Sequence, residues 1–160
     1  MGRINVGRVI ICGIIAGVIC FLGDGVVHGV LLKARWAEIM SAAGKGGAGD
    51  IGSQHPGYFI LYDLLKGLIA LWIYAAIRPN SGPGPATAFK AAILVWLLVI
   101  PVPIIGLLPM QFFGAEFALM WSIYGFVPII VGTLVGAWMY RDAAAPDKPR
   151  RGRLIDLDDA

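Results

Sequence analysis

The stretch VIICGIIAGVICFLGDGVVHGVLL, residues 9–32, decides the fold of this chain. It is predominantly apolar, with Asp24 and His28 as its strongly polar residues, and it exceeds the ~20 residues that cross the ~30 Å hydrocarbon core of a bilayer. Three further apolar stretches lie at about residues 58–77, 88–108 and 115–140. Because lipid offers no hydrogen-bond partners, such segments must satisfy their backbone internally as helices. The sequence therefore predicts an all-α integral membrane protein, a bundle of four transmembrane helices.

The composition supports the same fold class. Of the 160 residues, 58% are hydrophobic and only 14% are charged, so a water-soluble fold of this size could not bury its apolar surface. Two parts are expected: a membrane domain at residues 1–140, and a polar tail at residues 141–160 whose composition cannot form a core. The net charge of +3 comes from residues in the connections and the tail. We interpret it as a signal of membrane orientation, with the lipid bilayer as the partner and no nucleic acid.

The basic residues favour one orientation. With the N-terminus in the cytoplasm, the positive-inside rule is satisfied because nine basic residues lie inside and three outside. Inside are Arg3, Arg8, Arg78, Lys90, Arg141, Lys148, Arg150, Arg151 and Arg153; outside are Lys33, Arg35 and Lys45. We therefore expect a multi-pass protein of the bacterial inner (cytoplasmic) membrane with both termini cytoplasmic. On the outer side, the run from Arg35 to Met40 predicts a short interfacial helix, because Trp36, Ile39, Met40 and Ala43 share one stripe.

Ionisable residues inside membrane helices are costly and are therefore the first candidates for function. Asp24 and His28 lie four residues apart on the first helix, close enough to hydrogen-bond, and Asp63 and Lys66 lie one turn apart on the second. Glu116 begins the fourth. All five fall in the outer half of the bundle, which predicts one polar cluster in which Lys66 neutralises Asp24 or Asp63. The cluster is expected either to fix helix register or, through Asp24, Asp63 and Glu116, to form part of a proton or ion pathway.

His28 permits another interpretation. A histidine flanked by Gly25 and Gly29 on a membrane helix can ligate the metal of a haem or a chlorophyll, while the glycines admit the flat macrocycle. Asp24, one turn away, would orient the imidazole ring. The alternative is that His28 simply satisfies a polar neighbour.

Glycine spacing predicts close helix packing. The G-x-x-x-G pattern, which lets helix backbones approach in membranes, occurs at three places. These are Gly13 with Gly17, Gly25 with Gly29, and Gly132 with Gly136. The first and third pairs share the same depth, so they are expected to meet each other or to face a partner protein. Pro101, Pro103 and Pro128 predict bends in the third and fourth helices.

Three functions follow from these features. The preferred hypothesis is a non-catalytic accessory or structural subunit of a larger bacterial membrane complex, respiratory or photosynthetic in type, with other membrane subunits as partners. The alternatives are a small homo-oligomeric proton- or ion-coupled transporter or channel, and a haem- or chlorophyll-binding protein that uses His28. The sequence contains no nucleophile with a base, no phosphate-binding glycine loop and no metal-ligand motif. We therefore expect neither an enzyme nor a protein-ligated non-haem metal ion.

Overall fold

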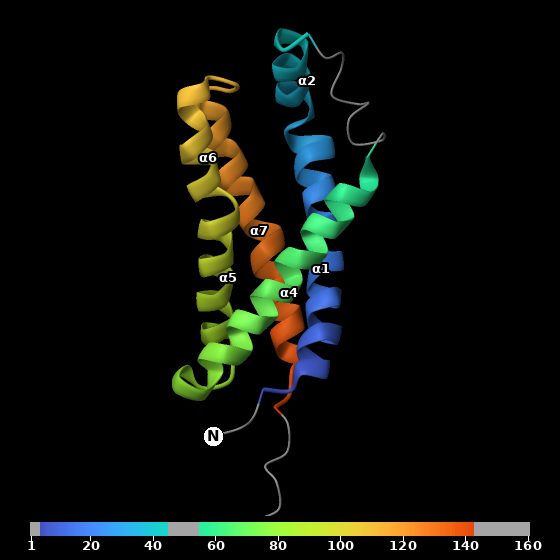
Figure 1. The fold of residues 1–160 in the computed structure, drawn as a ribbon, viewed down its shortest axis with the longest axis vertical. Coiled ribbons are helices and arrows are strands. Elements are labelled where there is room, and N and C mark those ends of the chain that lie inside the picture. Colours follow the sequence, from blue (N-terminus) through green and yellow to red (C-terminus); the bar gives the residue numbers. More distant parts are fainter. Residues whose placement is uncertain (1–3, 45–54, 143–160) are drawn as a thin grey trace, which may run out of the picture.

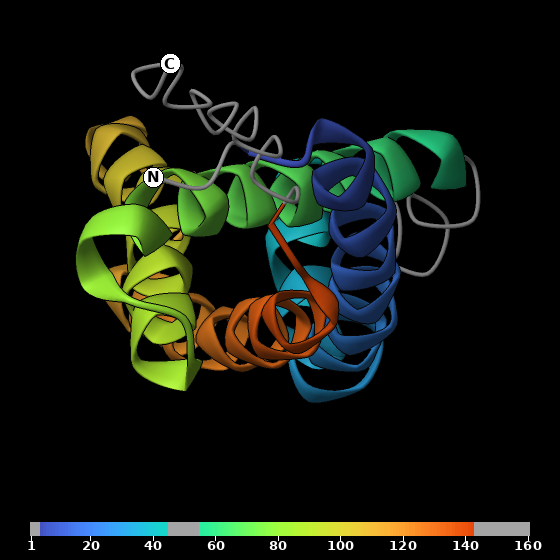
Figure 2. The same ribbon diagram turned by 90° about the horizontal axis from the view of Figure 1, so that it is seen from below.

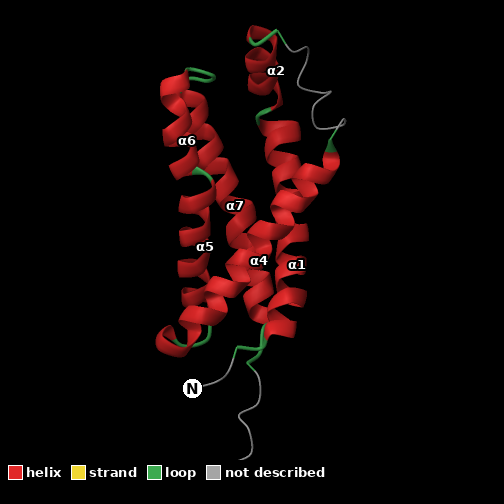
Figure 3. Ribbon diagram, in the orientation of Figure 1, coloured by secondary structure: helices red, strands yellow, loops and turns green. Residues whose placement is uncertain are grey.

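The computed structural model describes residues 4–44 and 55–142. Within these residues the chain is helical and contains no strand (Figure 3). Four of its helices are long and apolar enough to cross a membrane, which confirms the predicted all-α, four-helix architecture. Of the predicted tail at 141–160, only Arg141 and Asp142 belong to the described residues.

The four long helices lie close to the predicted stretches. Helix α1 (Val6–Val26) continues as one π-helical segment, η1 (Val27–Leu31), and is followed by the short α2 (Lys33–Ala42). Helix α4 covers Pro56–Ser81, α5 covers Pro85–Val99, and α6 (Pro101–Leu107) and η2 (Leu108–Met110) extend α5. Helix α7 covers Ala115–Met139. Several boundaries follow local chemistry: the Asn5 side chain caps α1 by accepting a hydrogen bond from the Arg8 amide at 3.1 Å, and Pro56 and Pro85 begin their helices.

The helices form a ring in the order α1, α4, α5, α7, with α7 returning to α1 (Figures 1 and 2). Helix α4 crosses the others obliquely. The start of α1 and the end of α7 lie at one end of the bundle, the terminal end, and α2 lies at the other, the α2 end (Figure 1). This arrangement places consecutive helices next to each other.

The prolines predicted to bend the third and fourth helices behave differently. At Ile100 the backbone leaves helical geometry, with φ −122° and ψ −75°, so α5 ends and α6 begins at Pro101. By contrast, α7 continues through Pro128 as a single helix. A Cβ added to Gly23 of α1 would lie 2.8 Å from the Pro128 ring, so the proline packs against a glycine and not against a larger side chain.

Two of the three glycine pairs lie at helix crossings. Gly13 and Gly17 face α4, where added Cβ atoms would lie 2.9 Å from Leu68 Cα and 2.6 Å from Leu64 Cα. Gly67 of α4 meets the same pair, since its added Cβ would collide with the backbones of both glycines. Small residues thus allow the α1 and α4 backbones to touch.

The second of these two pairs, Gly132 with Gly136, lies on α7 and faces α1. Added Cβ atoms would lie 2.7 Å from the Ala16 carbonyl oxygen and 2.9 Å from that of Cys12. Gly13 and Gly17 therefore do not meet Gly132 and Gly136, because α1 presents one face to α4 and another to α7. Gly13 with Gly17 and Gly132 with Gly136 are both covered by other helices of this chain, so neither pair is left for contact with a partner protein.

Candidate functional site

A buried ion-paired group, which we call the triad, joins α1 to α4. Lys66 of α4 donates a hydrogen bond to Asp24 Oδ2 of α1, and its ammonium nitrogen lies 2.5 Å from Asp63 Oδ1. The side chains of Lys66, Asp63 and Asp24 are 2%, 4% and 12% exposed. The predicted neutralisation of an aspartate by Lys66 is confirmed, and Lys66 pairs with both.

The helix crossing explains why these residues meet. Asp63 and Lys66 lie one turn apart and next to Gly67, the residue at which α4 touches α1. Asp24 follows Gly17 by two helical turns, so it lies on the same face of α1 as the crossing glycine. Close backbone contact therefore brings the Lys66 side chain to the Asp24 carboxylate.

The surroundings of the triad are mostly apolar. The Tyr62 ring lies 4.7 Å from the Lys66 ammonium nitrogen, and the Tyr62 hydroxyl donates to the Val99 carbonyl at 3.1 Å. Cys20, also nearby on α1, donates a weak hydrogen bond to the Pro128 carbonyl at 3.6 Å. Among the described residues, no second cation pairs with the triad. The group thus contains one ammonium and two carboxyl groups.

His28 lies outside the triad in an aromatic group at the α2 end. Its Nδ1 accepts a hydrogen bond from Trp36 Nε1 at 3.0 Å, and its ring packs edge-on against Trp121 with centroids 5.6 Å apart. It does not form the expected hydrogen bond with Asp24. The π-helical segment at Val27–Leu31 changes the side-chain register of the helix at this point, so the simple four-residue spacing no longer describes the pair.

The hydrogen bond from Trp36 also determines what His28 can ligate. Because the indole N–H is only a donor, the Nδ1 atom that it contacts is unprotonated, and a neutral imidazole then carries its proton on Nε2. A histidine that binds haem or chlorophyll iron or magnesium needs a free ring nitrogen. In this neutral form the Nδ1 lone pair accepts the Trp36 N–H and Nε2 carries the proton, so neither nitrogen has a free lone pair, which does not fit the expected ligand role.

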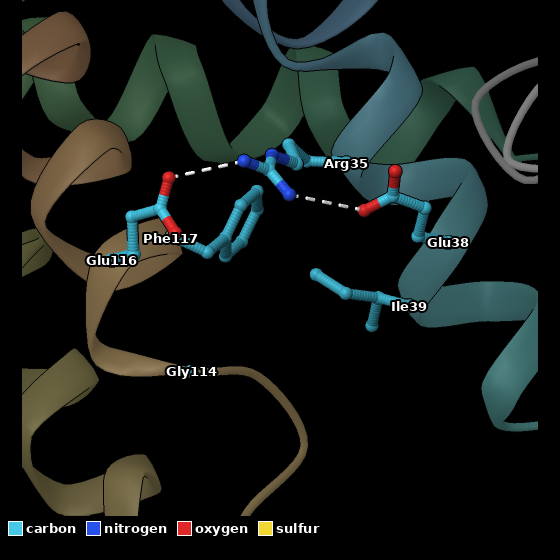
Figure 4. Close-up of a pocket in the computed structure, with 6 residues that line it drawn as sticks. All are labelled: Arg35, Glu38, Ile39, Gly114, Glu116 and Phe117. Atoms are coloured by element: carbon cyan, nitrogen blue, oxygen red, sulfur yellow. Dashed lines mark hydrogen bonds and ion pairs between the residues drawn. The ribbon is translucent and has the colours of Figure 1, made fainter.

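Glu116 is also separate from the triad. It accepts from Arg35 at 3.0 Å, and Arg35 also donates to Glu38 at 3.3 Å, so Arg35 ties α2 to the start of α7 (Figure 4). These side chains, with Ile39, Gly114 and Phe117, line an open cleft of about 210 Å³. The expected single cluster of Asp24, His28, Asp63, Lys66 and Glu116 is therefore corrected to three groups: the triad, the His28 aromatic group and the Arg35–Glu116 pair.

The terminal end holds a polar group that the sequence did not predict. Arg78 of α4 pairs with Asp142 at 2.7 Å and lies 5.4 Å from the centre of the Tyr140 ring. The Tyr140 hydroxyl accepts the Asn5 amide N–H at 3.1 Å, and burial raises the pKa of this phenol. Arg78 was interpreted only as an orientation charge, although Tyr74, one turn before it on α4, and Tyr140, at the end of α7, both lie beside it.

Gly25 and Gly29 differ from the other glycine pairs. Cβ atoms added to either residue would have no neighbour within 4 Å. Both glycines are exposed, and Leu22 on the same face of α1 is 63% exposed. This surface, which we call the open notch, is the one G-x-x-x-G pair in the described residues that no helix of the chain fills.

Comparisons with known proteins assign no family. A scan against protein-family models, a search of curated proteins and a search of solved structures each gave no match. Among residues 4–44 and 55–142, no three metal-ligating side chains come together. The triad and the open notch are therefore the features from which a function is inferred.

Proposed function

We propose that this chain is a four-pass membrane protein that serves as a non-catalytic accessory subunit of a larger membrane complex, respiratory or photosynthetic in type. It acts by packing its helices against other membrane subunits. The observation that carries the proposal is the open notch. Gly13 with Gly17 and Gly132 with Gly136 are each covered by a neighbouring helix, whereas Gly25 and Gly29, four residues apart in the sequence, have no cover.

Membrane placement is supported by the outer surface of the bundle. Large apolar side chains are exposed on every long helix, among them Leu22, Leu65, Leu98 and Val127. Lipid solvates such side chains, so their exposure does not require a partner protein to cover them. The notch is different because it lacks side chains: a second helix can approach its backbone closely and gain van der Waals contact that lipid tails fit less well.

Orientation follows from the charges of the described residues. The terminal end carries Arg8, Arg78, Lys90 and Arg141, and the α2 end carries Lys33 and Arg35. We propose that the terminal end faces the cytoplasm of a bacterial cell and that α2 lies at the outer membrane surface. A cysteine placed at Ser81, in a background where Cys12 and Cys20 are replaced, should resist a membrane-impermeant thiol reagent in intact cells. Labelling in intact cells would reverse the orientation.

The packing function is tested with variants of the open notch. Gly25→Leu and Gly29→Leu place a bulky side chain where a partner helix would sit, without a clash inside the chain. Gly106→Leu is the matched control, because Gly106 on α6 is also open. Native mass spectrometry of the gently solubilised wild type should show other membrane subunits bound. Both notch variants should lose them, and the Gly106 variant should keep them.

Gly132 and Gly136 are unsuitable for this test. Leucine at either position would collide with α1 and damage the fold itself, so loss of partners would carry no information about an interface. If the wild-type protein runs alone as a monomer or simple homo-oligomer, the accessory function is refuted.

One observation favours a second function, a small homo-oligomeric proton-coupled transporter. The triad holds two carboxyl groups for a single ammonium, and surplus intramembrane carboxyl groups occur in proton relays. Proton flux into liposomes that is abolished by Asp24→Asn and by Asp63→Asn would establish this function in place of the first. Haem or chlorophyll ligation by His28 is not proposed, because its Nδ1 is held by Trp36.

A further inference from the structure

The charges of the triad do not balance when every group is ionised. Lys66 contributes one positive charge, and Asp24 and Asp63 together contribute two negative charges. The side chains of Lys66 and Asp63 are almost completely buried, and that of Asp24 is nearly so. A surplus charge in such a place loses its hydration without an opposite charge to compensate for it.

The hydrogen bonds show the same deficit. Asp24 Oδ1 and Asp63 Oδ1 are both buried and accept no hydrogen bond from the described residues; Asp63 Oδ1 has only its ion-pair contact with Lys66. Because a carboxylate is an acceptor only, full ionisation leaves Asp24 Oδ1 without a donor and gives Asp63 Oδ1 only the Lys66 ammonium that it shares with Asp24. A protonated carboxyl group has an O–H to donate, and both aspartates contact the one Lys66 ammonium, which brings their carboxyl groups into one site.

We propose that the triad is a proton-binding site in which one proton is shared between the carboxyl groups of Asp24 and Asp63, so that the buried group is electrically neutral. One carboxylate remains to pair with the Lys66 ammonium. Two carboxyl groups that share a site commonly hold a single proton between them, because both cannot ionise at short separation.

The neighbours of the triad do not offer another source of positive charge. From α1 and η1 the nearby titratable groups are Cys20 and His28, and from α4 the nearest is Tyr62. His28 adds no positive charge, because its Nδ1 accepts the Trp36 N–H and is therefore unprotonated. Helices α7 and α5 contact these neighbours through backbone carbonyls, which carry no charge: Pro128 accepts from Cys20, and Val99 accepts from Tyr62. The Lys66 ammonium occupies the position between the carboxyl groups that a metal cation would take, and it would repel one.

Infrared spectroscopy tests the proposal on the full chain in lipid vesicles at pH 7. A protonated carboxyl group has a C=O band distinct from that of a carboxylate, and ¹³C-labelled aspartate assigns it. The wild type should show this band with the intensity of one group per chain. Asp24→Asn and Asp63→Asn should each abolish it, since the remaining carboxylate pairs with Lys66. Lys66→Met should increase it about twofold, because both carboxyl groups are then protonated to keep the site neutral.

Asp142→Asn is the matched control and should leave the band unchanged, because Asp142 pairs with Arg78 at the terminal end. Absence of the band from the wild type overturns the proposal, and so does a band that appears only after Na⁺ and K⁺ are removed. The wild-type measurement decides even if a variant fails to fold. The inference does not depend on the proposed packing function, since partner loss in the notch variants and the infrared band are separate readouts.

Discussion

Removing the charge of Lys66 should destabilise the protein strongly, and the loss should depend on pH. In Lys66→Met, the carboxyl group that paired with the ammonium must also take a proton to stay buried. One pKa unit corresponds to about 1.4 kcal/mol, and pH 7 lies about three units above the ordinary pKa of aspartate, so this proton costs about 4 kcal/mol. The value agrees with the roughly 3–5 kcal/mol lost when one partner of a buried ion pair is removed.

The sign of the pH dependence follows from proton binding. The folded variant holds a proton that the unfolded chain has released at pH 7, so its stability rises as the pH falls. Between pH 7 and pH 5 the loss relative to wild type should shrink from about 4 to about 1.5 kcal/mol. Reversible unfolding in mixed micelles with increasing SDS measures this difference.

Two further variants separate the charge effect from packing. Lys66→Met combined with Asp24→Asn and Asp63→Asn removes every charge, and it should recover most of the stability that Lys66→Met alone loses. Lys33→Met, at an exposed lysine of α2, should change stability by less than about 0.5 kcal/mol. A loss for Lys66→Met that is equal at both pH values, or a triple variant that is equally unstable, would refute the reasoning.

Three other predictions concern single contacts. Gly67→Ala should destabilise the fold by about 1–3 kcal/mol in the same unfolding assay, because its methyl group collides with the α1 backbone. Gly106→Ala, the control, places its methyl group in open space and should leave the stability unchanged. Equal losses of stability in the two variants would count against the close contact between α1 and α4. Trp36→Phe removes the donor to His28 and should cost about 1 kcal/mol, whereas no change would show that this hydrogen bond is not formed. Tyr140→Phe should cost a similar amount at neutral pH by removing the acceptor for the Asn5 amide. Burial raises the pKa of Tyr140, so its stabilisation should be lost as the pH rises past about 10 in the wild type but not in the variant.

The sequence predicted the fold from long-range composition and the ion pair from local spacing. Four apolar stretches of sufficient length predict four helices. Lys66 lies inside one of these stretches and needs an opposite charge, which Asp63 offers one turn away. Contacts between helices were harder to predict. Which glycine pair faces which helix depends on the ring order, and the sequence does not encode that order in any one segment.

The separation of His28 from the triad has a local cause that periodicity cannot reveal. The π-helical segment Val27–Leu31 contains His28 and widens this turn of the helix, so His28 no longer follows the α-helical spacing counted from Asp24. The Arg35–Glu116 pair was missed because it requires α2 to fold over the start of α7. The break at Ile100 and the continuity at Pro128 show that the effect of a proline depends on what packs against it.

The contact between α1 and α4 bears on how the chain enters a bilayer during synthesis. Helix α1 leaves the ribosome before α4, and α1 carries Asp24 whereas its counter-charge, Lys66, arrives only with α4. In the proposed membrane, α1 alone would expose a carboxyl group to lipid, and α4 alone would expose a carboxyl group and an ammonium. Entering together as a hairpin, the two helices conceal these groups from the acyl chains. The translocation machinery should therefore retain α1 until α4 has emerged, and truncation before Lys66 should leave α1 poorly inserted.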